Sequence, residues 1–164
     1  MNIVIIPARG GSKRIYRKNI QNFCGKPIIY WPIKIAQKSK LFDKIIVSTD
    51  DREIAEIAKS LGAETPFYRP TKLSDDYCGV SPVLSHAILW LENKSYEIEN
   101  VCCVYPTSVF LNKKDLIKGF DILTAGGWSY VFSATKFSYP IFRSFKKRGK
   151  AGVEMLFPEY YDSR

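Results

Sequence analysis

Short apolar runs alternate along this chain with segments whose apolar residues recur at helical spacing. Runs with the length and composition of buried parallel strands cover 2–6, 44–48, 64–67, 101–105 and 130–134. Helical spacing covers about 27–40, 51–61, 81–91 and 112–125. Because strands and helices follow one another in turn, we expect an α/β fold built on a doubly wound, mostly parallel sheet.

Residues at the expected helix ends agree with this reading. Ser81 fits the N-cap of the third helix with Pro82 as its first residue, and Asn112 fits the N-cap of the fourth. The pair Asp50 and Asp51 before the second helix has two interpretations, a metal-binding carboxylate pair or an N-cap. We favour the N-cap, because Asp is a routine residue at that position.

The pattern changes after 134, where no further helical period follows. Pro140, a basic turn at 146–150 and an aromatic run at 157–161 take its place. This composition predicts a β-hairpin arm. We therefore expect an α/β domain over 1–136 and an arm over 137–164.

Composition is that of a globular protein, with 46% hydrophobic and 25% charged residues. No apolar run is long enough to span a bilayer, and no signal peptide is visible at Met1, so we expect a cytoplasmic protein with no membrane partner. The four cysteines form no CxxC pair, and we expect buried, reduced thiols rather than a metal site.

The net charge of +9 indicates an anionic partner. One basic cluster lies in a ten-residue stretch of the loop after the first strand, at Arg9, Lys13, Arg14, Arg17 and Lys18. A second cluster, at Lys146, Lys147, Arg148 and Lys150, fits a solvated hairpin tip. A compact basic loop at a strand end suits a small polyphosphate better than a long nucleic acid, so an RNA-binding module is the weaker reading.

Ligands of open α/β sheets bind beyond the carboxyl ends of the strands. Three loops meet that condition, at 7–19, 48–51 and 105–108. In the first, Gly10 and Gly11 let the backbone approach a phosphate closely, while neighbouring Arg and Lys side chains neutralise its charge. The loop matches neither the Walker A pattern nor the dinucleotide fingerprint.

Several segments, in order, resemble the CMP-acylneuraminate synthetase family of cytidylyltransferases. They read IPARGGSK at 6–13, KN at 18–19, GKP at 25–27, STDD at 48–51, RP at 69–70, LSD at 73–75 and YPTS at 105–108. Within the family, the chain is most similar to the members that act on pseudaminic acid. Tyr105 stands where sialic acid synthetases typically have Gln, at a position that faces the acceptor sugar.

The resemblance implies a Rossmann-like nucleotidyltransferase fold with a dimerisation arm, and transfer of CMP from CTP to a nonulosonic acid. It implies catalytic roles for Arg9 and Lys18. The implied nucleotide- and phosphate-binding residues are Ala8, Arg9, Gly10, Gly11, Ser12, Lys13, Lys18, Asn19, Arg69 and Ser81. The implied sugar-binding residues are Tyr105, Pro106, Thr107 and Ser108.

The resemblance also implies a Mg²⁺ cofactor and a homodimer. Members of the family continue beyond a segment like 159–164, and that continuation carries the metal-binding aspartates, so we expect the metal ligands beyond Arg164 and a C-terminally truncated chain. Acceptors other than pseudaminic acid stay open, namely N-acetylneuraminic and legionaminic acid. A fragment that binds CTP without turnover is the alternative of another class.

Overall fold

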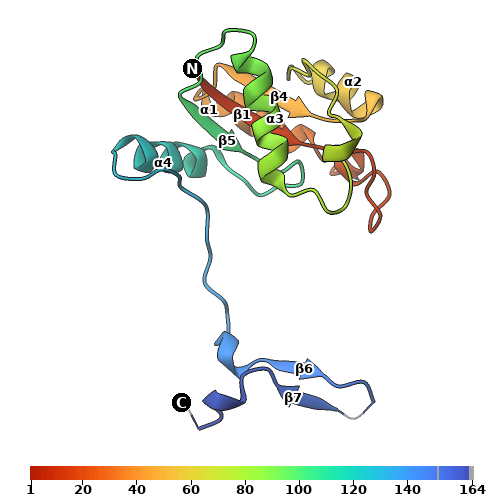
Figure 1. Cartoon of the computed structure of the whole chain (residues 1–164), viewed down its shortest axis with the longest axis vertical. Coiled ribbons are helices and arrows are strands. Elements are labelled where there is room, and N and C mark those ends of the chain that lie inside the picture. Colours follow the sequence, from red (N-terminus) through yellow and green to blue (C-terminus); the bar gives the residue numbers. More distant parts are fainter. Residues whose placement is uncertain (151, 163–164) are drawn as a thin grey trace. The chain divides into compact units, whose positions relative to one another are not determined.

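The computed structural model describes residues 1–150 and 152–162, which divide into two compact units, Met1–Ser129 and Tyr130–Arg164. The first unit holds the parallel sheet and the four α-helices, and the second holds one hairpin (Figure 1).

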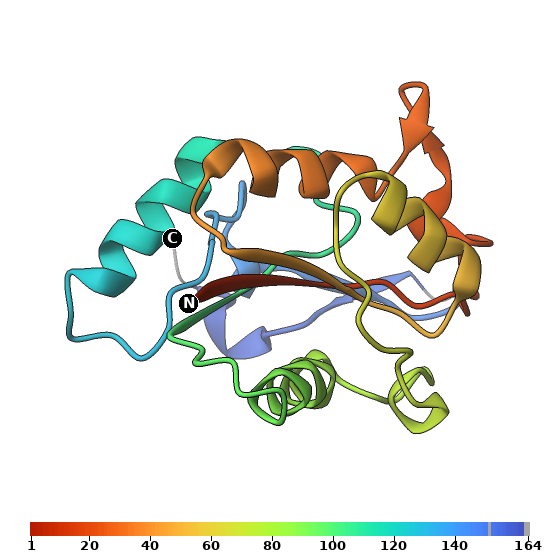
Figure 2. The same cartoon turned by 90° about the horizontal axis from the view of Figure 1, so that it is seen from above.

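Three parallel strands form the sheet of the first unit, in the order β4-β1-β5. They are β1 (Asn2–Pro7), β4 (Lys44–Ser48) and β5 (Asn100–Cys103). Helices α1 (Tyr30–Ser39), α2 (Arg52–Ser60) and α4 (Lys113–Thr124) lie on one side of the sheet and α3 (Val80–Glu92) on the other (Figure 2). The prediction of a doubly wound, parallel α/β fold is confirmed.

Strand β1 is buried on both faces because helices cover both sides of the sheet. Its side chains alternate, so Val4 and Ile6 join the layer of α1 and α2, and Ile3 and Ile5 join the layer of α3. All four are fully buried, and each stabilises the fold by about 1.5–3 kcal/mol relative to an exposed side chain. This buried central strand carries the loop that follows it.

The N-caps of two helices are as predicted. The Asp51 side chain accepts a hydrogen bond from Ile54 N–H at 3.0 Å at the start of α2. Asn112 and Asp115 form a capping box at the start of α4. Both helices therefore begin where their local sequence satisfies the free backbone N–H groups.

Two predicted helix starts are wrong. Helix α1 begins at Tyr30 rather than at 27, because β2 (Asn22–Phe23) and β3 (Lys26–Pro27) pair as a small hairpin. Helix α3 begins at Val80 with Gly79 as N-cap, so Ser81 is its second residue and caps nothing. Pro82 is the third residue of the helix, where its missing N–H costs no intrahelical hydrogen bond, so the helix can start before it.

The strand predicted at 64–67 is reduced to two isolated parallel bridges, Ile46 with Glu64 and Thr49 with Tyr68. Pro66 between them lacks the N–H that a continuous ladder requires. The strand predicted at 101–105 spans Asn100–Cys103 instead.

The prediction of a strand at 130–134 is also wrong, since no described residue pairs with this segment. The second unit contains the antiparallel hairpin of β6 (Phe145–Lys147) and β7 (Val153–Met155), which agrees with the predicted hairpin. Lys146 and Lys147 lie in β6 rather than in its turn, and Glu154 pairs with Lys146 and Arg148. Short 3-10 helices lie at Lys18–Ile20 (η1), Thr71–Leu73 (η2), Ile141–Arg143 (η3) and Pro158–Tyr160 (η4).

No helix within residues 1–150 and 152–162 is long and apolar enough to cross a membrane.

Candidate functional site

The basic loop leaves β1 at the carboxyl edge of the sheet, beside the end of β4. Ala8 N–H donates to Ser48 O at 2.9 Å, so the pairing of the two strands continues one residue past β1. The loop then turns over the start of α2, and its last residues form η1. The cationic side chains are thereby held at the edge where α/β sheets bind ligands.

Gly10 is enclosed by the aspartates that follow β4. Its N–H donates to Asp50 Oδ1 at 2.9 Å, and a Cβ at this position would lie only 2.6 Å from Asp51 Oδ2. Gly11 differs, because a Cβ there would meet nothing within 4 Å. The first glycine is therefore required by packing, while the second leaves open space beside the backbone.

Asp51 links the basic loop to α2. Besides capping the helix, its Oδ1 lies 2.9 Å from Arg17 Nη2, and the same nitrogen lies 2.7 Å from Glu53 Oε2. Burial raises the pKa of Asp51, but the hydrogen bonds from Ile54 N–H and from Arg17 outweigh it and hold that pKa below its ordinary value. The N-cap interpretation of Asp51 is confirmed, and Arg17 anchors the loop, whereas Arg14 is exposed.

The cations Arg9 and Lys13 contact a second loop, Ser74 to Cys78. Arg9 Nη2 lies 2.7 Å from Asp76 Oδ1, and Lys13 Nζ pairs with Asp76 Oδ2. Arg9 Nη1 also donates to the main-chain oxygens of Ser74 and Asp75. Hydrogen bonds from Lys13 and then Arg9 hold the pKa of Asp76 below its ordinary value. The family resemblance places the loop 74–81 at the nucleotide, but sequence reasoning did not foresee that Asp76 pairs with Arg9, because the two residues are 67 positions apart.

Asn19 is buried beneath the loop. Its Nδ2 donates to Arg9 O at 2.8 Å, while its Oδ1 has no hydrogen-bond partner. Ser12 N–H donates to Gly10 O at 3.0 Å and closes the glycine turn. Lys18, half-buried, begins η1 next to Asn19. The predicted phosphate-binding residues between 8 and 19 therefore lie in one continuous loop that ends in η1.

Arg69 is buried with only 6% of its surface exposed. Its backbone N–H donates to Thr49 O at 2.8 Å, and its Nη2 lies 3.8 Å from Asp50 Oδ1. Nε and Nη2 have no hydrogen-bond partner, which is unusual for a buried guanidinium. Burial lowers the pKa of Arg69, and the Asp50 carboxylate opposes this effect. Asp50 therefore joins Arg69 to the backbone of Gly10.

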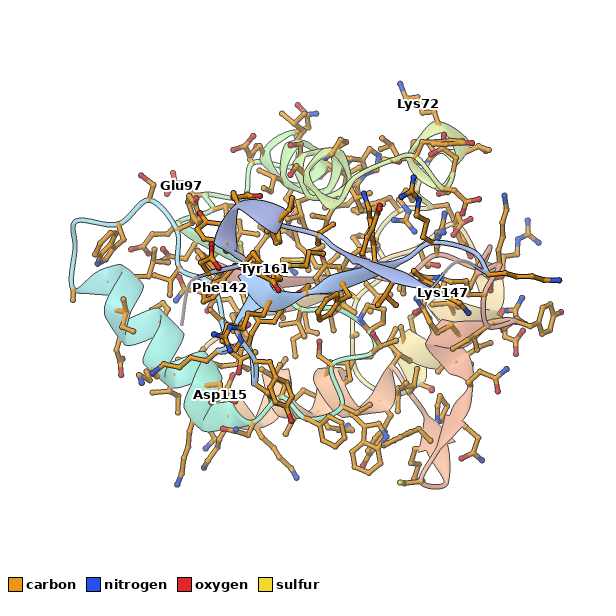
Figure 3. All side chains as sticks on the ribbon, turned by 90° about the horizontal axis from the view of Figure 1, so that it is seen from below. Lys72, Glu97, Asp115, Phe142, Lys147 and Tyr161 are labelled. Atoms are coloured by element: carbon orange, nitrogen blue, oxygen red, sulfur yellow. The ribbon has the colours of Figure 1, made fainter. Side chains whose placement is uncertain are left out.

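His86 on α3 packs edge-on against Phe67, with 4.8 Å between ring centroids. Burial lowers its pKa, and the charges of Arg69 and Lys72 lower it further. The exposed side chain of Lys72 extends away from the ribbon into solvent (Figure 3). The contact with Phe67 fits a packing role for His86.

The predicted sugar-binding residues follow β5 in a tight turn. Tyr105 is exposed, Pro106 is buried, and Ser108 N–H donates to Tyr105 O at 3.0 Å. Thr107 lies between them, half-buried. Ser81 has an exposed side chain in the first turn of α3. The roles of these residues toward a ligand stay predictions.

Within the described part of the chain, no three His, Cys, Asp or Glu side chains are grouped so as to hold a metal ion. Asp50 and Asp51 already accept hydrogen bonds from the backbone and from Arg17. No third acidic, His or Cys side chain joins this pair among the described residues, so the pair by itself is not a complete set of Mg²⁺ ligands.

All four cysteines are free thiols. The expectation that they are buried is wrong for Cys24, which is exposed in the turn of the β2–β3 hairpin, and the other three are only half-buried. Burial, with a smaller contribution from Cys103, raises the pKa of Cys102 to about 11.

Comparison with known proteins identifies related chains. The family model described as cytidylyltransferase matches residues 3–138. The pseudaminic acid cytidylyltransferase of Campylobacter jejuni is 43% identical over 163 residues, which are 99% of this chain and 70% of that protein. The N-acylneuraminate cytidylyltransferase of Oncorhynchus mykiss is 32% identical over 93% of this chain and 34% of that protein.

Among solved structures, a CMP:2-keto-3-deoxy-manno-octonic acid synthetase complexed with CTP is similar to this chain, with a TM-score of 0.63 at 18% sequence identity. The match covers 76% of this chain and 47% of that one. This likeness concerns the fold.

Proposed function

The chain belongs to the cytidylyltransferase family, and on this premise we propose that it transfers CMP from CTP to pseudaminic acid with release of pyrophosphate. The observation that carries the proposal is the loop from Arg9 to Asn19. It is cationic, it is bound to the β4–α2 junction through Gly10 and Arg17, and it lies at the carboxyl edge of the sheet. A relative named for this activity matches 99% of the chain.

In the proposed reaction, the anomeric hydroxyl oxygen of the sugar bonds to the α-phosphorus of CTP. The bond from that phosphorus to the bridging oxygen breaks, pyrophosphate leaves with the electron pair, and the hydroxyl proton passes to solvent. Positioning and charge neutralisation are what such a displacement needs from a protein. Arg9, Lys13 and Lys18 would neutralise the triphosphate, and the open backbone at Gly11 would let its oxygens approach.

Mg²⁺ belongs to this proposal as the cofactor, since it would neutralise phosphate oxygens. The described residues do not supply its ligands, and no step above depends on it.

Tyr105, with Pro106, Thr107 and Ser108, would face the acceptor sugar from the end of β5. N-acetylneuraminic and legionaminic acids are the competing acceptors. A homodimer is also proposed, supported by large exposed apolar side chains at Trp128, Tyr130, Phe132, Phe137 and Tyr139. A cytoplasmic location is consistent with four free thiols.

A pyrophosphate-release assay with CTP, Mg²⁺ and each of the three sugar acids tests the activity. Release with pseudaminic acid in preference to the other two is expected. No release with any of them from a folded sample would contradict the proposed activity and leave the CTP-binding alternative.

Thermal unfolding with CTP tests binding separately from turnover. CTP at about 100 times its Kd should stabilise the native state by about 2.7 kcal/mol. Lys18→Ala should remove this shift, because it removes a cation from the phosphate loop. Lys118→Ala, an exposed position on α4, is the control and should retain it. If CTP stabilised Lys18→Ala as much as wild type, Lys18 would not be a ligand of the triphosphate.

A further inference from the structure

One carboxylate neutralises two of the cations assigned to phosphate. Asp76 directs Oδ1 to Arg9 and Oδ2 to Lys13, so each oxygen meets a different cation. Two oxygens on one centre, contacting an Arg and a Lys, reproduce the way these side chains bind a phosphate group. In the free protein, therefore, the cationic loop is already bound to an anion of its own chain.

We propose that Asp76 is an internal competitor of the nucleotide, which occupies Arg9 and Lys13 in the free protein and is displaced by the triphosphate. The inference rests on the proposed function, since it takes these two cations as the phosphate ligands. It adds to that function a residue that sets the affinity of the site for phosphate ligands.

Charge decides the competition. Asp76 brings one negative charge to the two cations, whereas a nucleoside triphosphate brings several. The triphosphate is therefore attracted to Arg9 and Lys13 more strongly than Asp76 is, and it displaces the Asp76 carboxylate. The product of the proposed reaction carries one negative charge on its phosphodiester and one on the sugar carboxylate, fewer than the triphosphate. Displacing Asp76 lowers the affinity of substrate and product by the same factor, and the return of Asp76 to Arg9 and Lys13 assists product release.

The turn that carries Asp76 does not depend on the ion pairs of the Asp76 carboxylate. Its aspartate side chain is 31% exposed, and its neighbours Asp75 and Tyr77 are exposed as well. The turn itself is held by Asp75, whose Oδ1 accepts from Tyr77 N–H at 2.9 Å and Cys78 N–H at 2.7 Å. Releasing the Asp76 carboxylate leaves those two hydrogen bonds in place.

The neighbouring aspartate provides a matched control. Asp76→Asn and Asp75→Asn each remove one formal negative charge from the same loop, but only the Asp76 carboxylate touches Arg9 and Lys13. In Asp75→Asn, the amide oxygen still accepts the two backbone hydrogen bonds.

The experiment is a calorimetric titration of wild type and both variants with inorganic tripolyphosphate, in parallel with CTP. Asp76→Asn should bind tripolyphosphate about three- to tenfold more tightly than wild type, the range that two exposed charge pairs are worth, and Asp75→Asn should stay within about twofold. Asp76→Ala lacks the same charge and serves as a second variant should Asp76→Asn fold poorly.

Unchanged tripolyphosphate affinity in both Asp76 variants, or an equal gain in Asp75→Asn, would overturn the proposal. So would the absence of tripolyphosphate binding in every variant. Failure of the proposed function would give a different result. CTP would then bind wild type no better than tripolyphosphate does, while Asp76→Asn would still bind tripolyphosphate more tightly than wild type.

Discussion

Gly10→Ala tests the packing of the basic loop. The added Cβ would lie 2.6 Å from Asp51 Oδ2 and 2.9 Å from Asp51 Cβ, both far inside van der Waals contact. The second distance involves an atom close to the backbone, so rotating the end of the side chain cannot relieve it. Either the loop or the start of α2 must shift.

The loss of stability in Gly10→Ala can be worked out from the contacts that Asp51 makes. Its carboxylate caps α2 at 3.0 Å and binds Arg17 at 2.9 Å, and displacing it weakens both contacts. Overpacking of this kind costs about 1–3 kcal/mol, and loss of a helix cap costs typically ~1 kcal/mol. We expect the free energy of unfolding to fall by about 2 kcal/mol, which in a chain of this size lowers Tm by roughly 4–8 °C.

Gly11→Ala is the matched control, because its Cβ would meet nothing within 4 Å. Its Tm should stay near that of wild type, while CTP affinity should fall if the backbone at Gly11 approaches the phosphates. Urea unfolding and CTP titration of both variants separate the two effects. A Gly10→Ala protein with wild-type stability, or a Gly11→Ala protein that is equally destabilised, would refute the packing argument.

Two further predictions concern titration. The pKa of Asp51 is depressed in the folded protein, so its contribution to stability is complete above the ordinary value of about 3.9 and is lost as the pH falls through the folded value. In urea unfolding, the free energy of unfolding should fall less between pH 5 and pH 3 in Asp51→Asn than in wild type. An equal fall in both proteins would count against the ion pair. The pKa of Cys102 is about 11, so at pH 8 roughly one thiol in a thousand is ionised. Iodoacetamide should therefore modify exposed Cys24 at least about tenfold faster than Cys102 in the native protein, as read by peptide mass spectrometry, and equal rates would show that Cys102 is not shielded.

Local pattern was sufficient wherever one segment carried its own signal. The run 44–48 predicted β4 residue for residue, and Asp51 and Asn112 predicted two helix starts, because strand period and capping depend on neighbouring residues. Local pattern failed where pairing across the chain was required. The runs 64–67 and 130–134 have strand composition, yet the first makes only bridges and the second pairs with no described residue. A strand exists only with a partner, and no single segment specifies its partner.

The site divides in the same way. The sequence by itself determined that cations and glycines gather in the loop after β1, and the alternation of strands and helices implied that this loop lies at the edge where ligands bind. Only the tertiary structure decided how those cations are held: Arg17 by Asp51, Arg69 beside Asp50, and Arg9 and Lys13 on Asp76. Coulomb attraction acts over a few ångströms of space, and the residues it joins here are far apart along the chain, so their pairing became visible only once the chain was folded.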